Sequence, residues 1–320
     1  MNITLQEAGA KLLSAEKIII TAHINPDGDA LGSSLGLYHV LKDMGKSVEV
    51  IIDDDLPDDF DFLPGYELIK KPEAEKYEAD LLVLLDVSYD ERIGRLREKY
   101  QGTVLNIDHH GTNKGDVDYL YLDADRAATA EIIYQLVQEL KVKVSQDIAY
   151  CLYTGMTTDT GHFRYSNTSA FTMRAAAAML EAGVKAEVVS EALEKRSYKE
   201  IIDRAKAMLT IEQFASGRVA GIFIDLPLYE SLDTTEGYID GVRVLAGVDV
   251  AILMKEIEPG VCRVSMRSKG VDVSVIAASF DGGGHIRAAG CTIKKPLAEA
   301  KKMLLDKVIS VIGTEPQKEA

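Results

Sequence analysis

The chain has 320 residues, more than one ordinary hydrophobic core accommodates, so two domains are expected. Its composition, 47% hydrophobic and 27% charged, excludes an intrinsically disordered protein. The net charge of -15 disfavours stable binding to long nucleic acid, which requires a basic surface, but leaves small anionic ligands open because bound divalent cations reverse the local charge.

The N-terminal segment, residues 1–17, is polar and lacks the basic and apolar regions of a signal peptide. Apolar runs such as residues 81–85 are far too short to span a bilayer. Cys151, Cys262 and Cys291 form no CxxC pair, which favours a reducing compartment over a disulfide framework or a zinc ribbon. We therefore expect a cytoplasmic protein that does not enter the membrane.

Up to about residue 187, short apolar runs alternate with stretches of helical periodicity, the pattern of an α/β domain whose largely parallel sheet is flanked by helices. The predicted strands are residues 17–22, 47–53, 80–86 and 103–108. The predicted helices are residues 32–45, 127–140, 146–156 and 169–183. Pro26 and Gly28 should keep residues 23–30 out of a helix, and Gly32 should open the helix that follows.

The second half of the chain begins with a charged helical stretch that we predict to be a linker rather than a flexible tether. Three strands should follow, the last two joined by a hairpin at Pro259 and Gly260, and two helices should cover their sheet. These elements are strands 218–226, 250–258 and 261–268 and helices 273–280 and 297–313. The sequence thus predicts a domain over 1–187, a helical linker over 188–213 and a smaller α/β domain with a mixed or antiparallel sheet over 214–320.

Polar residues gather where three of the predicted parallel strands end. These residues are His23, Asp27, Asp29, Asp86, Asp108, His109 and His110. A further acid, Asp159, lies in residues 155–169, a segment rich in threonine and glycine that we predict to be a loop. Because ligands gather beyond the carboxyl ends of the strands in such a sheet, we expect these side chains to share one edge.

Carboxylates crowded at one edge repel each other unless they are protonated, separated or neutralised by cations. Neutralisation fits best, because imidazole and carboxylate ligands suit manganese and similar ions, and no thiolate stands nearby to favour structural zinc. Two imidazoles and four carboxylates would give six ligands, and six ligands indicate two ions. Two ions about 3.5–4 Å apart can activate water and bind both sides of a phosphoryl group. Asp86, alone on its strand, is the candidate that would bridge both ions.

Simpler explanations exist for each residue taken singly. Asp29 or Asp159 could be a helix cap or a turn residue, and His109 and His110 could be core or surface histidines. The gathering of so many such residues at strand ends is what favours a joint site.

These residues resemble the motifs of the DHH phosphoesterase superfamily, which is named for the triplet that stands here at 108–110. The matching segments are HINPDGDA (23–30), LLDVS (84–88), NIDHHGTN (106–113) and TDTGHFRYSNTS (158–169). GGGHIRAAG (282–290) resembles the DHH-associated nucleotide-binding domain. The chain length and the order of the domains are most similar to the group of nanoRNases and 3'-phosphoadenosine 5'-phosphate (pAp) phosphatases.

The resemblance implies a role for each candidate residue. One Mn²⁺ ion would be held by His23, Asp27 and Asp86, and a second by Asp29, Asp86, His109 and Asp159. His110 would face the scissile phosphate as a catalytic residue, and Asp108 would orient the histidines. In the second domain, the substrate's phosphate and sugar would be bound by Arg267, Gly282, Gly283, Gly284 and His285.

The same resemblance implies a Mn²⁺-dependent phosphoesterase, with Mg²⁺ or Co²⁺ as substitute ions. It would degrade oligoribonucleotides of a few residues, including pApA, to mononucleotides and dephosphorylate pAp to AMP, by attack of a water activated between two metals. A phosphodiesterase for cyclic di-AMP or pApA is the alternative enzyme. A nucleotide sensor without catalysis is the alternative that is not an enzyme. A homodimer, formed through apolar helices near residues 169–182, stays open.

Overall fold

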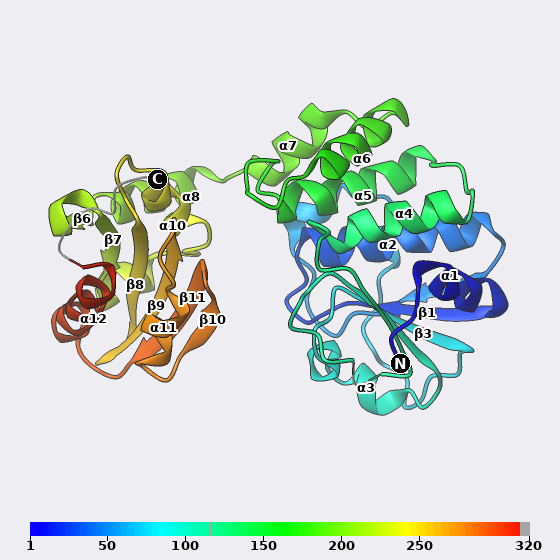
Figure 1. Ribbon diagram of the computed structural model, residues 1–320, viewed down its shortest axis with the longest axis horizontal. Helices are drawn as coiled ribbons and strands as arrows, with labels where there is room; N and C mark the ends of the chain where they lie inside the picture. Colours follow the sequence, from blue (N-terminus) through cyan, green and yellow to red (C-terminus); the bar gives the residue numbers. More distant parts are fainter. Residues whose placement is uncertain (116, 314–320) are drawn as a thin grey trace. The chain divides into compact units, whose positions relative to one another are not determined.

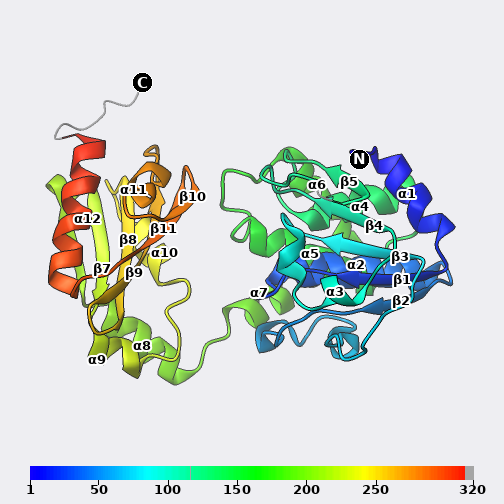
Figure 2. The same ribbon diagram turned by 90° about the horizontal axis from the view of Figure 1, so that it is seen from below.

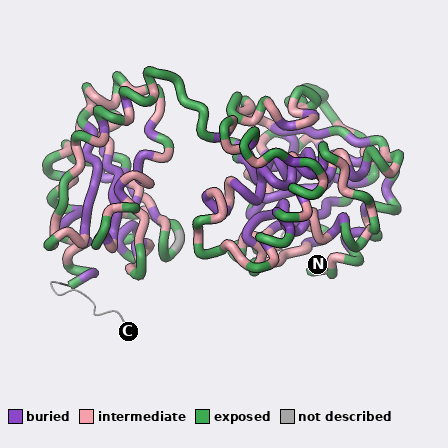
Figure 3. The backbone as a smooth tube through the Cα atoms, turned by 90° about the horizontal axis from the view of Figure 1, so that it is seen from above, coloured by how far each residue is buried: buried purple, intermediate pink, exposed green. Residues whose placement is uncertain are grey.

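The computed structural model describes residues 1–115 and 117–313, except for the side chain of His285. The chain divides into two compact units, Met1–Lys195 and Arg196–Ala320 (Figure 1). This division falls within the predicted linker, residues 188–213. Each unit has buried strands at its centre and exposed connections around them (Figure 3). Among the described residues, no helix combines the length and the hydrophobicity needed to cross a bilayer.

The first unit contains a five-stranded sheet in the order β2-β1-β3-β4-β5, and every pairing between neighbouring strands is parallel. Its strands are β1 (Lys17–Thr21), β2 (Ser47–Val50), β3 (Leu81–Leu85), β4 (Val104–Asp108) and β5 (Tyr119–Leu122). The predicted α/β class and the four predicted strands are confirmed. The fifth strand was not predicted, because it has four residues of which Leu120 alone is buried, so its pattern is too short to recognise.

Most helices of this unit pack on one face of the sheet. They are α1 (Leu5–Ser14), α2 (Gly28–Asp43), α4 (Thr129–Glu139), α5 (Gln146–Asp159), α6 (Ala170–Glu181) and α7 (Ala186–Glu194). Ile18 and Ile20 of β1 belong to the same core as these helices, whereas Ile19 points to the other face. That face is covered by α3 (Leu96–Lys99) and by the 3₁₀ turn Asp90–Ile93. Two further 3₁₀ turns span Asp58–Phe60 and Tyr66–Leu68.

Two predictions about local structure near the strand ends are wrong. Helix α2 begins at Gly28, not at Gly32, because the Asp27 carboxylate accepts the N–H groups of Asp29 and Ala30 at 3.1 and 3.0 Å and caps the helix. Pro26 precedes this cap and does not prevent helix formation. Asp159 is the last residue of α5 and does not lie in a loop.

Glycines allow α2 and α5 to pack closely. A Cβ atom on Gly32 would lie 2.4 Å from the carbonyl oxygen of Cys151, and one on Gly155 would lie 2.8 Å from Oδ1 of Asp29. Both distances are shorter than any real contact, so the two helices could not approach this closely with larger residues. Their contact brings the N-terminal end of α2 next to the C-terminal end of α5, and thus Asp29 next to Asp159.

The second unit contains a six-stranded mixed sheet in the order β10-β11-β9-β8-β7-β6. Figure 2 shows the strands of this sheet from β7 to β11. Its strands are β6 (Ile211–Phe214), β7 (Val219–Ile224), β8 (Val250–Glu258), β9 (Val261–Ser268), β10 (Gly283–His285) and β11 (Ala288–Ile293). Its helices are α8 (Tyr198–Met208), α9 (Leu226–Ser231), α10 (Tyr238–Arg243), α11 (Ser274–Ala278) and α12 (Leu297–Ile312). A 3₁₀ turn, Ala215–Gly217, connects β6 to β7.

The predicted hairpin is present between β8 and β9. The first of the three predicted strands, β7, pairs with β8 in parallel, so these three strands do not form a purely antiparallel sheet, which was one of the two predicted arrangements. A parallel pair requires a crossover, and α9 and α10 supply it between these two strands. The sheet is therefore mixed, as the broader prediction allowed.

Candidate metal and active site

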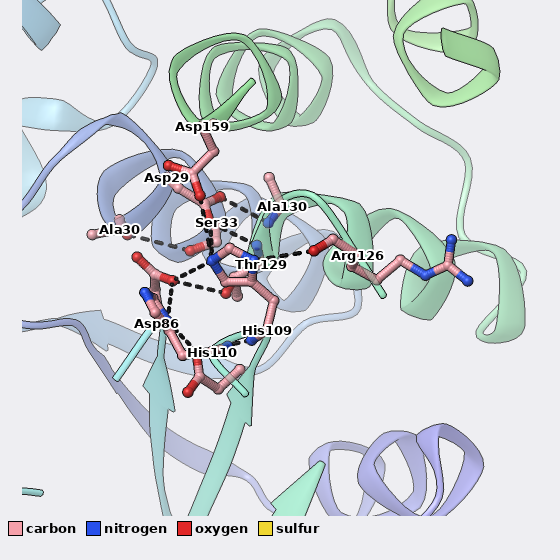
Figure 4. A network of polar contacts seen from close by, with 12 residues as sticks. Asp29, Ala30, Ser33, Asp86, His109, His110, Arg126, Thr129, Ala130 and Asp159 are labelled. Atoms are coloured by element: carbon pink, nitrogen blue, oxygen red, sulfur yellow. Dashed lines mark hydrogen bonds and ion pairs between the residues drawn. The ribbon is translucent and has the colours of Figure 1, made fainter. Parts of the chain in front are cut away.

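The predicted site residues of the first unit do converge at one edge of its sheet. His23, Asp86 and His109 follow β1, β3 and β4. Asp29 comes from α2 and Asp159 from α5 (Figure 4). Among the described residues, three overlapping groups of side chains have ligand atoms within 4.8 Å of one another. They are His23, Asp27 and Asp86; Asp29, His109 and Asp159; and Asp86, His109 and His110.

His23 presents one ring nitrogen to two carboxylates. Its Nδ1 lies 2.9 Å from the carbonyl oxygen of Ile24, which can only accept a hydrogen bond, so Nδ1 carries a proton. Its Nε2 then faces Oδ2 of Asp86 at 3.4 Å and Oδ2 of Asp27 at 3.9 Å. This arrangement leaves Nε2 available as a ligand for a cation between the three side chains.

His109 has the same arrangement on the other side of Asp86. Its Nδ1 donates to the carbonyl oxygen of Arg126 at 3.2 Å, which directs Nε2 into the cluster. Within the described chain, Nε2 is buried without a hydrogen-bond partner, and it faces Asp159 at 3.3 Å and Asp86 at 3.4 Å. Oδ2 of Asp29 lies 4.0 Å away. A buried nitrogen that lacks a partner and faces carboxylates fits a metal position.

Asp86 lies between the two histidine groups and is only 2% exposed. Its Oδ2 faces His23, whereas its Oδ1 faces His109 and also accepts a hydrogen bond from the hydroxyl of Thr129 at 3.1 Å. Its backbone has a φ of +62°, a conformation that few residues other than glycine adopt. Such strain is typical of functional sites, and here it aims the two carboxylate oxygens at different groups.

The electrostatics of the cluster match a site built for cations. Burial raises the pKa of Asp29 and Asp159 well above the ordinary value, and the charge of nearby Asp86 raises both further. Burial acts to raise the pKa of Asp86 as well, but the neighbouring imidazole rings of His109 and His23 outweigh burial and lower the pKa. Although burial disfavours the charged form of His109, the surrounding carboxylates raise its pKa to about 10. The carboxylates thus require positive charge beside them, which protons or metal ions can supply.

The carboxylate of Asp108 binds neighbouring residues of its own turn and does not face the candidate metal positions. Its Oδ1 accepts the backbone N–H of His109 at 2.8 Å and Nδ1 of His110 at 2.8 Å, and its Oδ2 accepts the Asn113 amide at 2.8 Å. These bonds occupy the carboxylate and fix the turn that carries both histidines. Since Nδ1 of His110 is held by Asp108, its Nε2 remains available for another partner.

The N-terminal end of α4 orients several of these residues, and the sequence did not reveal it. Asp29 accepts the backbone N–H groups of Thr129 and Ala130 at 2.6 and 2.9 Å, so Asp29 caps α4 in place of the residue at its N-cap, Ala128. The cap interpretation and the ligand interpretation of Asp29 are compatible, because each carboxylate oxygen has two lone pairs. Residues 127–130, Ala-Ala-Thr-Ala, offered no sequence signal, since backbone groups make most of these contacts.

The remaining candidates belong to the second unit. Arg267 lies on β9 and is partly buried. Gly282 and Gly284 have packing reasons to be glycine, because a Cβ atom would lie 2.3 Å from the carbonyl oxygen of Gly290 and 2.5 Å from that of Ala288, respectively. A Cβ atom on Gly283 would meet nothing within 4 Å. The side chain of His285 lies outside the part of the chain that the structure describes.

A cavity of about 830 Å³ lies beside this glycine segment. Gly282 and the basic residues Arg263, Lys294 and Lys295 are part of its lining, together with one acid, Asp281. The excess of basic side chains suits an anionic ligand.

The chain is similar to known families and proteins. Residues 17–156 match the model of the DHH family, N-terminal domain, and residues 231–314 match that of the DHHA1 domain. The chain is similar to proteins named bifunctional oligoribonuclease and PAP phosphatase NrnA. The one from Thermus thermophilus is 36% identical, with 87% of this chain and 84% of the relative covered. The one from Mycoplasma pneumoniae is 30% identical, with 91% and 92% covered.

A solved structure shows the same fold. The crystal structure of an exopolyphosphatase-related protein from Bacteroides fragilis is 26% identical, with a TM-score of 0.88. The alignment covers 96% of this chain and 95% of that one.

Proposed function

Because the chain belongs to the DHH phosphoesterase family and is a hydrolase acting on phosphoester bonds, we propose that it degrades short oligoribonucleotides and dephosphorylates pAp. Its products would be mononucleotides, and AMP in the case of pAp. The names of the relatives from Thermus thermophilus and Mycoplasma pneumoniae support these two substrate classes. We propose the cytoplasm as its location, since the three cysteines are free and buried.

One observation carries the proposal: the two carboxylate oxygens of Asp86 face two histidines, His23 and His109, which belong to separate groups of possible ligands. His23 and Asp27 would complete the position of one Mn²⁺ ion with Asp86, and Asp29, His109 and Asp159 would complete that of the other. Their nitrogen and oxygen donors suit Mn²⁺, with Mg²⁺ or Co²⁺ as substitutes. When bound, such a pair of ions lowers the pKa of water and stabilises the charge that develops on a phosphoryl group.

His110 is the proposed catalytic residue that acts on the substrate itself. Burial lowers the pKa of its ring, but the hydrogen bond to Asp108 and the charge of Asp86 outweigh burial and raise the pKa. A protonated ring could donate from Nε2 to a phosphate oxygen or to the leaving group. Asp108 is the proposed positioning residue, because it holds Nδ1 of His110 and the backbone of the turn.

Residues 1–187 would form the catalytic domain, 188–213 the linker and 214–320 the substrate-binding domain. Within the last, Arg267 and the segment Gly282, Gly283, Gly284 and His285 would bind the phosphate and sugar of the substrate. Gly283 is the glycine at which a ligand could approach the backbone most freely. The basic cavity beside Gly282 supports an anionic ligand in this unit.

A panel of substrates tests this function. With Mn²⁺ present, the protein should cleave pApA and convert pAp to AMP, while long oligoadenylate, cyclic di-AMP and pyrophosphate should react much more slowly. Product identity can be followed by chromatography. Cyclic di-AMP as the best substrate would favour the cyclic dinucleotide alternative, and nucleotide binding without any cleavage would establish a sensor. Either result would refute the proposal.

A further inference from the structure

One buried carboxylate near the site belongs to none of the groups described above. Glu131, in the first turn of α4, is fully buried, and its Oε1 has no hydrogen-bond partner among the described residues. Burial raises the pKa of this carboxyl, and neighbouring Thr172 and the N–H of Ala127 oppose the rise. A buried, incompletely paired carboxylate is costly, which calls for a reason for its presence.

The contacts of Glu131 lead to His109 through a single peptide group. Oε2 of Glu131 accepts the N–H of Ala127 at 3.2 Å. The carbonyl of the same peptide, that of Arg126, accepts Nδ1–H of His109 at 3.2 Å. The N–H and C=O of a trans peptide point in opposite directions. The carboxylate therefore accepts a hydrogen bond on one side of the peptide group, and the imidazole donates one on the other. Hydrogen bonds linked in this way polarise one another and strengthen together.

We propose that Glu131 is a positioning residue that fixes the Arg126–Ala127 peptide and, through it, the ring of His109. The peptide then keeps the proton of His109 on Nδ1 and directs Nε2 toward Asp86 and Asp159. Histidines that bind metals usually donate their other N–H to a carboxylate or carbonyl, and loss of that partner lowers the affinity for the metal. Here the partner is a backbone carbonyl, and Glu131 stands behind it. This inference rests on the proposed function, since it assumes that His109 holds an ion.

Further contacts of Arg126 restrict the same peptide. The side chain of Arg126 binds Asp123 at 3.0 Å and lies over the ring of Phe171, with 4.2 Å between the guanidinium carbon and the ring centroid. These contacts hold the side chain of Arg126, whereas the fully buried Glu131 holds the peptide that follows it. While the contacts of the Arg126 side chain and the contact of Glu131 are both present, the carbonyl of Arg126 cannot turn away from His109.

Metal affinity measures this role without relying on activity. Titration of the metal-free protein with Mn²⁺, followed by the electron paramagnetic resonance signal of the free ion, gives the affinity of each of the two sites. Glu131→Met should weaken one of the two affinities by about 10- to 100-fold. Glu131→Asp, whose shorter side chain cannot reach Ala127, should do the same. Glu131→Gln retains an oxygen acceptor for the Ala127 N–H and should stay close to wild type.

A control separates this role from general destabilisation. Thr4→Ala removes the N-cap of α1 in the same unit and should lower the melting temperature while leaving both ion affinities unchanged. Wild-type ion affinities in both Glu131→Met and Glu131→Asp would overturn the proposal, whatever their melting temperatures. Should Glu131→Met fail to fold, Glu131→Asp alone decides. The proposed function fails separately, if the wild-type protein cleaves none of the offered nucleotides.

Discussion

Replacement of Asp86 with asparagine should lower turnover by at least about 1,000-fold, because both proposed metal positions lose the carboxylate that they share. The number of Mn²⁺ ions bound per chain should fall from two to at most one. Asparagine suits this position, since it has nearly the volume of aspartate and tolerates the φ of +62° better than most residues. Loss of activity would then reflect lost ligands and not a disturbed backbone.

Kinetics with pAp and metal analysis of the dialysed protein measure these two effects. Asp59→Asn provides a matched control, because Asp59 is an exposed acid of the same unit outside the cluster. Two tightly bound ions in Asp86→Asn, together with near-normal turnover, would rule out a bridging role for this carboxylate.

Replacement of His110 with asparagine should lower turnover without loss of bound metal. Turnover should fall by about 100- to 10,000-fold, the range for loss of a residue that transfers or donates a proton. Both ions should remain bound, because Nδ1 of His110 is engaged by Asp108 and its Nε2 is not needed by either proposed metal position.

The structure also identifies the result that would contradict this role. Nδ1 of His110 lies 3.4 Å from Oδ1 of Asp86, and the two residues belong to one of the possible metal groups. If His110→Asn loses an ion, the histidine is a ligand. His39→Asn serves as the control, since the ring of His39 bonds to the carbonyl of Pro64 away from the cluster. It should retain both turnover and metal.

Much of the first unit could be predicted because its central strands are short apolar runs that end in candidate site residues. Leu81–Leu85, buried along its whole length, leads directly to Asp86. Burial on both faces removes any alternation from such a strand, so apolar composition alone identifies it. The fifth strand, Tyr119–Leu122, lies at the edge of the sheet with little burial, and the sequence does not distinguish it from a loop.

The local structure around the ligands was harder to predict. Pro26 and Gly28 are common helix breakers, but the Asp27 cap and the close approach of α5 to Gly28 outweigh them. A Cβ atom on Gly28 would lie 2.4 Å from Thr158, so the glycine serves helix packing and not an open loop. Such contacts join residues about 130 positions apart, and local sequence patterns cannot report them.

The groups that orient the candidate ligands were the hardest part of the site to predict from the sequence. Thr129, Glu131 and the carbonyl of Arg126 orient Asp86, Asp29 and His109, but two of these contacts use backbone atoms that any residue possesses. Similarly, Gly282 and Gly284 have packing reasons for being glycine, so the glycine pattern combines structural and functional requirements. The sequence identified side chains that could bind metals, whereas the structure was needed to show what holds them.

Anomalous diffraction from crystals grown with Mn²⁺ tests the central claim most directly. We expect two peaks beside Asp86: one contacted by His23 and Asp27, and the other by Asp29, His109 and Asp159. A single peak at saturating Mn²⁺, or two peaks of which neither contacts Asp86, would contradict the proposed two-metal site.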